Sequence, residues 1–392
     1  MGKQTTYEPA MIFDYRDPLE GFEGWLVIDR FVHRLCAGGM RVQQGLTRDH
    51  LVAMARNMTK KMKIAGLRVD GAKCGIDYPP DSPGKADAVK RFLGAIAPYI
   101  RSNYSMGPDL NIDMAELEVA AAAIGIPSVK IAIAGCQGWT SEYFLERSEI
   151  LNRKIDRFTL GQLRAGYGVS SAVLGMLEHL GIEARGATVA IQGFGNLAKA
   201  AIYGLNEAGV VIRAISDQNR CLTALTDKGL NAAELLAHRG TLLPDPTDPT
   251  STRVSDRNDI TGCTCDILVP AAIENTVTAE VASKLKVNAV VPGANLAITE
   301  IGAHVLYENA VPALPDFVAG SGGSLSMEGL YGPDEHPKPQ DVLDHVKLRM
   351  KEMVKQVMER STSLGVIPVE AALGICDERE DLPDTRPYGR LH

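Results

Sequence analysis

Residues 187–198 read ATVAIQGFGNLA, a short apolar run that ends in a glycine-rich turn. The run at 187–192 has the composition of a buried strand, and residues 197–208 have that of a helix. A second apolar run at 210–216 follows the helix. Strand, helix and strand in this order form a crossover unit with parallel strands. The stretch therefore predicts an α/β domain.

The turn itself carries the pattern G-x-G-x-x-A in Gly193, Gly195 and Ala198. After a strand and before a helix, this spacing lets a dinucleotide pyrophosphate approach the helix N-terminus. Asp217 follows the second strand, where an acid accepts hydrogen bonds from the adenosine ribose and repels a 2′-phosphate. NAD is therefore favoured over NADP, although the nearby Arg220 weakens this discrimination. The alternative is a tight turn followed by a solvated aspartate.

A second chemical signal lies at residues 66–77, GLRVDGAKCGID, where Lys73 stands between glycines. Lys61 precedes it by twelve residues, near the end of a helix predicted over 47–65, and we expect both lysines to converge on one cleft. Asp109 follows a proline in a predicted loop. A lysine beside a carboxylate in an apolar cleft suits amine chemistry at a carbonyl carbon. Solvated surface lysines are the alternative.

The rest of the chain alternates predicted strands and helices. Further strands are expected within 22–44 and at 128–134, 265–269, 287–292 and 312–315. Further helices are expected at 84–103, 115–124, 162–181 and 338–363, and a surface loop at 240–259.

Composition excludes several classes of function. The 392 residues suggest two domains, and the net charge of −7 argues against a nucleic-acid or basic membrane surface. No run reaches the roughly 20 apolar residues of a membrane span, and acids stand where a signal peptide would be apolar. The seven cysteines are scattered and the eight histidines form no metal-binding pattern. We expect a cytoplasmic protein without a metal site.

The ordered set of motifs resembles the glutamate/leucine/phenylalanine/valine dehydrogenase superfamily, over roughly residues 20–360. The motifs, in family order, are AGGMRV (37–42), MTKKMKIAGLRVDGAKCGI (58–76), GPDLNIDM (107–114), AGYGV (165–169), AIQGFGN (190–196), CDILVPAAIEN (265–275), GANLAIT (293–299) and LPDFVAGSGGS (314–324). Members deaminate an L-amino acid to a 2-oxo acid and ammonia with a nicotinamide cofactor.

The resemblance implies a role for individual residues. Lys73 matches the catalytic lysine, Asp109 the proton-relaying aspartate, Lys61 the lysine that binds the α-carboxylate, and Gly39 a glycine whose backbone lines the amino-acid site. The expected cofactor contacts are Gly193, Phe194, Gly195, Asn196, Leu197, Asp217, Ala271 and Asn295.

The resemblance also implies the architecture, an α/β protein of two domains with a cleft between them. Residues 1–137 form the substrate domain, residues 150–332 the Rossmann-type NAD domain, and helices within 338–376 return to the substrate domain. The cleft is expected to close on hydride transfer. Members are usually oligomers, so a homo-oligomer is expected.

Two departures from the family bear on the substrate side chain. Glutamate-specific members carry a lysine where this chain has Ala37 and a serine where it has Met327. Without a cation and a hydroxyl, a second carboxylate would be buried unpaired at a cost of several kcal/mol. An apolar or aromatic substrate is therefore expected.

Four further departures are Ala165 for a threonine beside the nicotinamide, Gly320 for an asparagine, Asn111 for a glycine, and Cys74 next to Lys73. Ala165 and Gly320 leave open a specialised biosynthetic relative that acts on an unusual amino acid, keto acid or imine. An inert small residue is the favoured interpretation of Cys74. A cofactor-binding protein without turnover is the alternative from another class, although the joint presence of Lys61, Lys73 and Asp109 argues against it.

Overall fold

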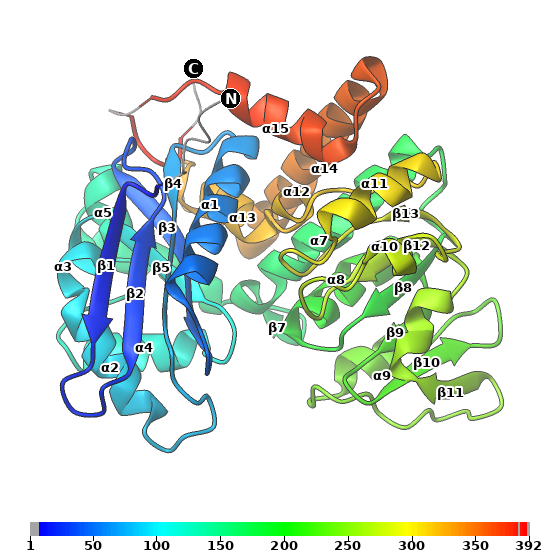
Figure 1. Ribbon diagram of the computed structural model, residues 1–392, viewed down its shortest axis with the longest axis horizontal. Coiled ribbons are helices and arrows are strands. Elements are labelled where there is room, and N and C mark those ends of the chain that lie inside the picture. Colours follow the sequence, from blue (N-terminus) through cyan, green and yellow to red (C-terminus); the bar gives the residue numbers. More distant parts are fainter. Residues whose placement is uncertain (1–7, 383–384, 390–392) are drawn as a thin grey trace, which may run out of the picture. The chain divides into compact units, whose positions relative to one another are not determined.

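The computed structural model describes residues 8–382 and 385–389, and the chain divides into two compact units (Figure 1). The first comprises residues 1–149 with 379–392, and the second comprises residues 150–378. Each unit has its own mixed sheet flanked by helices. Among the described residues, no helix is both long and apolar enough to cross a bilayer.

The first unit is built on a five-stranded sheet in the order β1-β2-β4-β3-β5. Neighbours β1/β2 and β2/β4 are antiparallel, whereas β3 runs parallel to both β4 and β5. The strands are β1 (Met11–Arg16), β2 (Glu23–Ile28), β3 (Leu35–Val42), β4 (Val69–Ile76) and β5 (Tyr104–Pro108). The helices are α1 (Arg48–Ile64), α2 (Lys85–Ala95), α3 (Ala97–Ser102), α4 (Met114–Ala122), α5 (Ala132–Gln137) and α6 (Ser141–Ser148).

Helix α1 forms where its sequence predicts it. The Thr47 hydroxyl caps the helix by accepting a hydrogen bond from the His50 N–H. The helix packs directly on β4 because Gly71 has no side chain: a Cβ at this position would lie 2.2 Å from the Thr59 nitrogen. The Gly71 N–H donates instead to the Thr59 hydroxyl at 3.2 Å. This glycine therefore sets how closely β4 approaches the helix.

The second unit contains a six-stranded sheet in the order β11-β10-β9-β8-β12-β13. Strands β9, β8, β12 and β13 are neighbours in this order and run parallel to one another. At one edge of the sheet, β10 pairs antiparallel with β9, and β11 pairs antiparallel with β10. The strands are β8 (Thr188–Gln192), β9 (Val211–Ser216), β10 (Arg220–Ala224), β11 (Thr252–Asp256), β12 (Cys265–Pro270) and β13 (Val287–Val290). A short hairpin of β6 (Lys154–Ile155) and β7 (Phe158–Thr159) precedes them.

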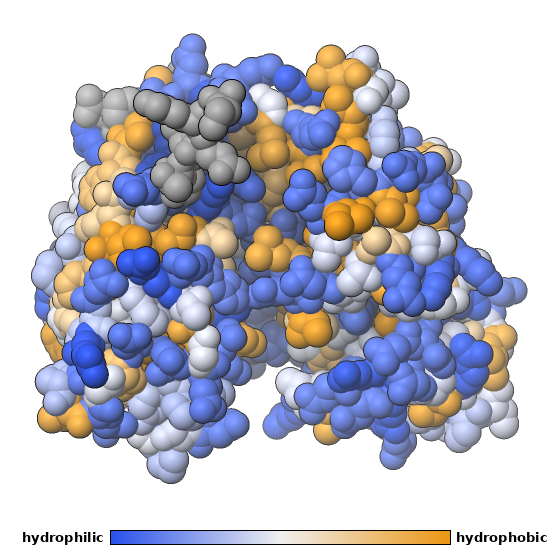
Figure 2. Space-filling view, in the orientation of Figure 1, coloured by the Kyte–Doolittle hydropathy of each residue, from blue (hydrophilic) through white to orange (hydrophobic). Residues whose placement is uncertain are grey.

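Helices surround this second sheet. They are α7 (Leu160–His179), α8 (Asn196–Glu207), α9 (Ala232–Ala237), α10 (Ala279–Ala282), α11 (Glu300–Glu308), α12 (Asp316–Ala319), α13 (Gly322–Tyr331), α14 (Pro339–Leu364) and α15 (Pro368–Glu378). Helix α7 contacts α8, α13 and α14, and glycines make this possible. A Cβ at Gly166 would lie 2.2 Å from the Leu197 oxygen, and one at Gly168 would lie 2.3 Å from the Gly322 Cα. The face in Figure 2 is largely hydrophilic over α9, β10 and β11.

The structure corrects three expectations about single elements. Residues 128–134 are not a strand, because residues 132–134 belong to α5 and the Glu118 carboxylate accepts from the Ser128 hydroxyl at 2.9 Å and from the Val129 N–H at 3.2 Å. Residues 312–315 contribute a single bridge, between Ala313 and Val290. The expected loop 240–259 contains β11, which pairs with β10.

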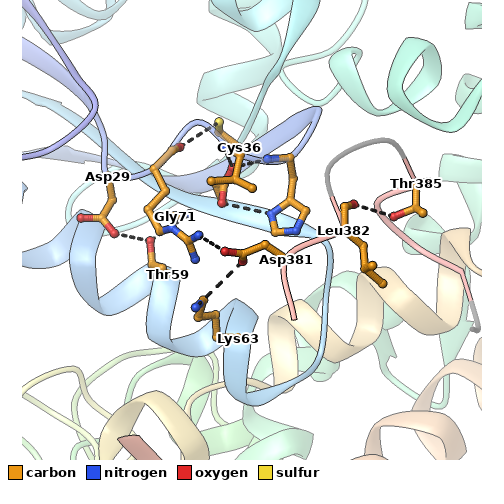
Figure 3. A network of polar contacts seen from close by, with 12 residues as sticks. Asp29, Cys36, Thr59, Lys63, Gly71, Asp381, Leu382 and Thr385 are labelled. Carbon is orange, nitrogen blue, oxygen red and sulfur yellow. Dashed lines mark hydrogen bonds and ion pairs between the residues drawn. The ribbon is translucent and has the colours of Figure 1, made fainter. Parts of the chain in front are cut away.

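The C-terminal helices also differ from expectation. Helices α14 and α15 belong to the second unit, whereas residues 379–392 belong to the first. In the first unit, Asp381 pairs with Arg30 and lies 3.9 Å from Lys63 (Figure 3). Further along, the Gln137 amide donates to the Tyr388 oxygen at 2.9 Å and accepts from its N–H at 3.2 Å. The described part of the tail is thus held by specific contacts.

Candidate active site

Lys73 and Asp109 form an ion pair within the first unit. Lys73 lies on β4, and Asp109 follows the last residue of β5. Strand β3 runs between these two strands and is parallel to both. The Lys73 Nζ lies 2.9 Å from Asp109 Oδ2, and the lysine side chain is buried. The sheet register therefore brings together a lysine and a carboxylate that are far apart in sequence.

Arg41 is a second cation that contacts Asp109. The sequence did not point to this arginine. It lies on β3, two residues after Gly39, and its Nε donates to the same Asp109 Oδ2 at 2.9 Å. Its Nη1 donates to Gln43 at 3.2 Å, and its side chain is buried. The available signal was strand alternation: residues 39 and 41 share a face of β3. Two cations thus converge on one carboxylate oxygen.

The electrostatics keep this carboxylate ionised. Burial acts to raise the pKa of Asp109, but the positive charges of Lys73 and Arg41 and their hydrogen bonds outweigh it. The pKa falls from its ordinary value to about 2. At neutral pH the site therefore holds an ionised carboxylate in contact with the Lys73 side chain.

Glycines let β3 lie close to this ion pair and to β4. A Cβ at Gly39 would lie 3.1 Å from the Asp109 Cβ and 3.3 Å from the Lys73 Nζ. A Cβ at Gly38 would lie 1.6 Å from the Ala72 oxygen, so β3 and β4 could not pair in this way with any larger residue. Gly39 therefore lets the backbone of β3 lie close to the Asp109 and Lys73 side chains.

The other predicted residues of the first unit, Lys61 and Ala37, lie on elements that contact β4. Lys61 is buried in the last turn of α1, the helix that packs on β4. Ala37 is buried on β3, opposite Gly71. The convergence of Lys61 with Lys73 stays a prediction, as do the binding roles of Lys61 and Ala37.

Two departures near Lys73 have a structural explanation. Cys74 is fully buried, and burial raises the pKa of its thiol to about 12, so it stays protonated as an inert small residue. Asn111 has a φ of 61°, a left-handed conformation that glycine and asparagine tolerate best. Its side-chain amide also donates to the Val42 oxygen at 2.9 Å.

Asp70 holds the connection between β2 and β3. Its buried carboxylate accepts from the backbone N–H groups of Val32 and His33 at 2.7 and 2.6 Å. The His33 Nδ1 lies a further 3.1 Å away. These hydrogen bonds attach the connection between β2 and β3 to β4.

The glycine loop of the second unit joins β8 to α8. Gly193 has a φ of 108°, and its N–H donates to the Ser216 oxygen at 2.8 Å. Gly195 is the N-cap of α8 and provides no side-chain cap, so the N–H groups of the first turn are available to an anion. A Cβ at Gly193 would lie 3.0 Å from the Ala271 oxygen, which places Ala271 next to the loop. These residues fit a dinucleotide pyrophosphate.

The remaining loop residues differ in environment. Asn196 and Leu197 begin α8, with Asn196 exposed and Leu197 half-buried. The Phe194 ring is buried and points away from solvent: it stacks on His238 with centroids 6.1 Å apart, and the Lys199 Nζ lies 4.6 Å from its centre. Only the backbone of Phe194 is therefore suited to contact the cofactor.

Asp217 lies directly after β9, as predicted, but its carboxylate is already engaged. Oδ1 accepts from the N–H groups of Asn219 and Arg220 at 2.7 and 2.8 Å, and Oδ2 accepts from Leu243 at 2.6 Å. Burial acts to raise the pKa of Asp217, but these hydrogen bonds hold it below its ordinary value. A carboxylate offers about four acceptor positions, so about one remains for a ribose hydroxyl.

The predicted residues near the nicotinamide and the substrate side chain lie on other elements of the second unit. Asn295 follows β13, Gly320 ends α12, and Met327 is buried in α13. Ala165 lies in α7, next to Arg164, whose Nη1 donates to the Gly323 oxygen at 2.9 Å and the Ser326 hydroxyl at 3.0 Å. Among the described residues, no three His, Cys, Asp or Glu side chains gather as metal ligands.

Two family models match this chain. The model described as Glutamate/Leucine/Phenylalanine/Valine dehydrogenase matches residues 162–376, and the dimerisation-domain model of Glu/Leu/Phe/Val dehydrogenase matches residues 10–125. Together they cover both units.

Curated relatives are similar over most of their length. Glutamate dehydrogenase of Thermotoga maritima is 28% identical, over 78% of this chain and 71% of its own. NAD-specific glutamate dehydrogenase of Peptoniphilus asaccharolyticus is also 28% identical, over 78% and 71%. NADP-specific glutamate dehydrogenase of Saccharolobus shibatae is 26% identical, over 78% and 70%.

Solved structures share the fold. The hetero-hexameric glutamate dehydrogenase of Thermus thermophilus, in a Leu bound form, has a TM-score of 0.75 at 23% identity and covers 95% of this chain and 88% of its own. L-tryptophan dehydrogenase of Nostoc punctiforme has a TM-score of 0.62 at 15% identity, over 94% and 95%. The chain thus belongs to the Glutamate/Leucine/Phenylalanine/Valine dehydrogenase family, and it is an oxidoreductase that acts on amino acids with NAD or NADP.

Proposed function

We propose that this enzyme uses NAD to deaminate an L-amino acid with an apolar or aromatic side chain, and that it also catalyses the reverse amination. The contact of Lys73 and Arg41 with one oxygen of Asp109 is the observation that carries the proposal. Water is consumed in the forward direction, and the products are a 2-oxo acid, ammonia, NADH and a proton. In the reverse direction, ammonia, a 2-oxo acid, NADH and a proton are consumed and water is released.

Residues of the first unit perform the acid–base chemistry in this proposal. Lys61 binds the substrate α-carboxylate, and the Gly39 backbone lines the amino-acid site. Asp109, ionised above a pKa of about 2, accepts a proton from the substrate amine. After the hydride has left the α-carbon, Lys73 polarises the water that attacks this carbon. The C–N bond then breaks, ammonia leaves with a proton from the water, and Lys73 stabilises the oxygen that becomes the carbonyl. Arg41 holds the Asp109 carboxylate in position.

Residues of the second unit bind the cofactor. When bound, the nicotinamide ring accepts the hydride from the substrate α-carbon. The first-turn N–H groups of α8, after Gly195, hold the pyrophosphate. Ala271 and Asn295 contribute to the nicotinamide end, and the remaining acceptor position of Asp217 takes a ribose hydroxyl. Because a carboxylate repels a 2′-phosphate, we propose a preference for NAD.

The apolar or aromatic character of the substrate side chain is inferred from Ala37 and Met327. Both are buried apolar residues at positions where glutamate-specific members of the family have a lysine and a serine. A glutamate side-chain carboxylate would have neither partner there, and an unpaired buried charge is strongly unfavourable. Several relatives are named glutamate dehydrogenases, so this proposal separates the chain from them in substrate but not in reaction.

A specialised substrate is the second candidate, and Arg164 favours it. This arginine contacts α13 close to Gly320, at which the family has an asparagine that helps hold the substrate carboxylate. A changed carboxylate environment would suit an unusual amino acid, keto acid or imine.

A homo-oligomer is also proposed, and the Thermus thermophilus relative is described as hetero-hexameric.

The test is NADH oxidation with ammonia across a panel of 2-oxo acids with aliphatic, aromatic and acidic side chains. We expect turnover with aliphatic or aromatic acids and little with 2-oxoglutarate. Preferential turnover of 2-oxoglutarate would contradict the proposed pocket. No turnover across the panel, with NAD binding intact, would contradict the proposed substrate class and support the specialised one. A Lys73→Ala variant, expected to lose activity, shows that the measured turnover belongs to this site.

A further inference from the structure

The loop 238–245 follows α9 and is attached to the beginning of α8. Lys199 on α8 is buried, and its Nζ donates to the backbone oxygens of His238 and Gly240 at 2.7 and 2.6 Å. The His238 ring stacks on Phe194, which belongs to the glycine loop. One end of the loop is therefore held against the element that would bind the pyrophosphate.

The other end of the loop is attached to the turn after β9. The Leu243 N–H donates to Asp217 Oδ2 at 2.6 Å, and the Arg220 Nη2 donates to the Leu243 oxygen at 2.6 Å. The Arg220 Nη1 donates to Asp245 Oδ1 at 2.7 Å. Leu243 is buried, whereas the Asp245 side chain is 90% exposed. The loop thus contacts both residues that the sequence analysis associated with the choice of cofactor.

These contacts change what Arg220 can do. Its backbone N–H contacts Asp217, so it lies at the place where a cation would recognise the 2′-phosphate of NADP. However, Arg220 gives one donor to a carbonyl and another to a carboxylate. The Asp245 charge offsets that of the guanidinium and would itself repel a phosphate. The Arg220–Asp245 ion pair is at the surface, so it contributes little to the stability of the fold. Its main expected effect is on the binding of a 2′-phosphate next to Arg220.

We propose that loop 238–245 selects the cofactor: Asp245 acts as a positioning residue that holds Arg220 on the loop and so excludes the 2′-phosphate of NADP. This inference rests on the proposed preference for NAD. Lys199 and Asp217 fix the loop at its two ends, and Asp245 supplies the charge that opposes the phosphate. Removal of the Asp245 charge makes the Arg220 Nη1 available to that phosphate, while Nη2 still donates to the Leu243 oxygen.

The test measures binding without turnover. Dissociation constants for NAD and NADP are measured by titration calorimetry, without amino acid, for wild type, Asp245→Asn and the double variant Asp245→Asn/Arg220→Gln. Asp227→Asn is the matched control, because Asp227 is also exposed and lies 3.5 Å from an arginine, Arg213. Melting temperatures confirm that each variant folds.

We expect Asp245→Asn to bind NADP at least about tenfold more tightly than wild type, with NAD binding nearly unchanged. The double variant should lose this gain, and Asp227→Asn should behave as wild type. An unchanged NADP affinity in Asp245→Asn would overturn the inference, as would a gain that persists without Arg220. The wild-type preference is a separate result: tighter binding of NADP than of NAD would contradict the proposed function, whereas the ratio between Asp245→Asn and wild type decides the role of the loop.

Discussion

At the scale of single residues, the central feature is a carboxylate shared by two cations. Lys73 and Asp109 stand out in the sequence because glycines and a proline surround them, and the family resemblance assigns them roles. Arg41 was missed, because an arginine on a strand has no local signature and its contact with Asp109 depends on the register of β3 with β5. The hydrogen bonds that already occupy Asp217 were not predictable either, because Leu243 is distant in sequence.

Arg41 should affect catalysis through Asp109. Arg41→Met removes a charge that lowers the pKa of Asp109, so this pKa should rise and the acid limb of kcat/KM should move to higher pH. We expect kcat to fall at least about tenfold, since the carboxylate loses a positioning contact. Arg41→Lys keeps the charge and should restore part of the loss.

Steady-state rates from acidic to basic pH, with NAD affinity measured separately, check this prediction. Unchanged NAD affinity together with a shifted pH profile identifies a positioning role. Wild-type kcat and pH profile in Arg41→Met would show that the contact has no catalytic importance.

Asp17 gives a pH-dependent prediction for the stability of the first unit. This buried carboxylate accepts from the Arg91 Nε at 2.7 Å and from the Glu20 N–H at 2.7 Å. Burial acts to raise its pKa, but these contacts lower it from 3.8 to about 2. A folded-state pKa below the unfolded one stabilises the fold above pH 3.8, and the contribution is lost as the pH falls through about 2.

Asp17→Asn should therefore reduce the free energy of unfolding by about 2 kcal/mol at pH 7, and by less at pH ~3. Urea unfolding followed by tryptophan fluorescence measures this, because both tryptophans, Trp25 and Trp139, lie in the first unit. An equal loss at both pH values would contradict the assignment to Asp17 ionisation.

At the scale of elements, prediction worked where the local sequence encodes the element. Thr47 caps α1, and the alternation of apolar runs with helices marks β8, α8 and β9. It failed at 128–134, where an apolar stretch with strand composition is held by Glu118 and Ser128. The pairing of β11 with β10 was also missed, because the polar composition of 240–259 is typical of a loop.

Contacts between helices depend on glycine in the second unit. Gly168 on α7 faces Gly322 on α13, and a methyl group at Gly168 would lie 2.3 Å from the Gly322 Cα. Gly168→Ala should force the helices apart and cost about 2 kcal/mol of stability. Because α13 carries Met327, substrate binding should weaken as well.

Gly94→Ala is the control, since Gly94 lies in α2 and a Cβ there has no atom within 4 Å. Alanine should stabilise that helix by about 0.5–1 kcal/mol. Thermal unfolding followed by circular dichroism compares the two variants. Similar melting temperatures for them would contradict the role given to close packing of α7 and α13.

At the scale of the whole molecule, two domains and an α/β class follow from length and from the order of strands and helices. The unit to which a segment belongs was harder to predict. Helices α14 and α15 pack in the second unit, and only residues 379–392 rejoin the first. The amphipathic pattern of a helix shows that one face is covered but does not show what covers it. Such membership depends on tertiary contacts that no local pattern encodes.

The central claim is that the reaction of the family takes place here on a substrate without a side-chain carboxylate. The most direct measurement is the ratio of kcat/KM for 2-oxoglutarate to that for 4-methyl-2-oxopentanoate, with NADH and ammonia. We predict a wild-type ratio below about 0.01, and a rise of at least about tenfold in the Ala37→Lys/Met327→Ser variant, which supplies the missing cation and hydroxyl. A wild-type ratio above about 1 would contradict the claim, as would a ratio that the double substitution leaves unchanged in a folded, active variant.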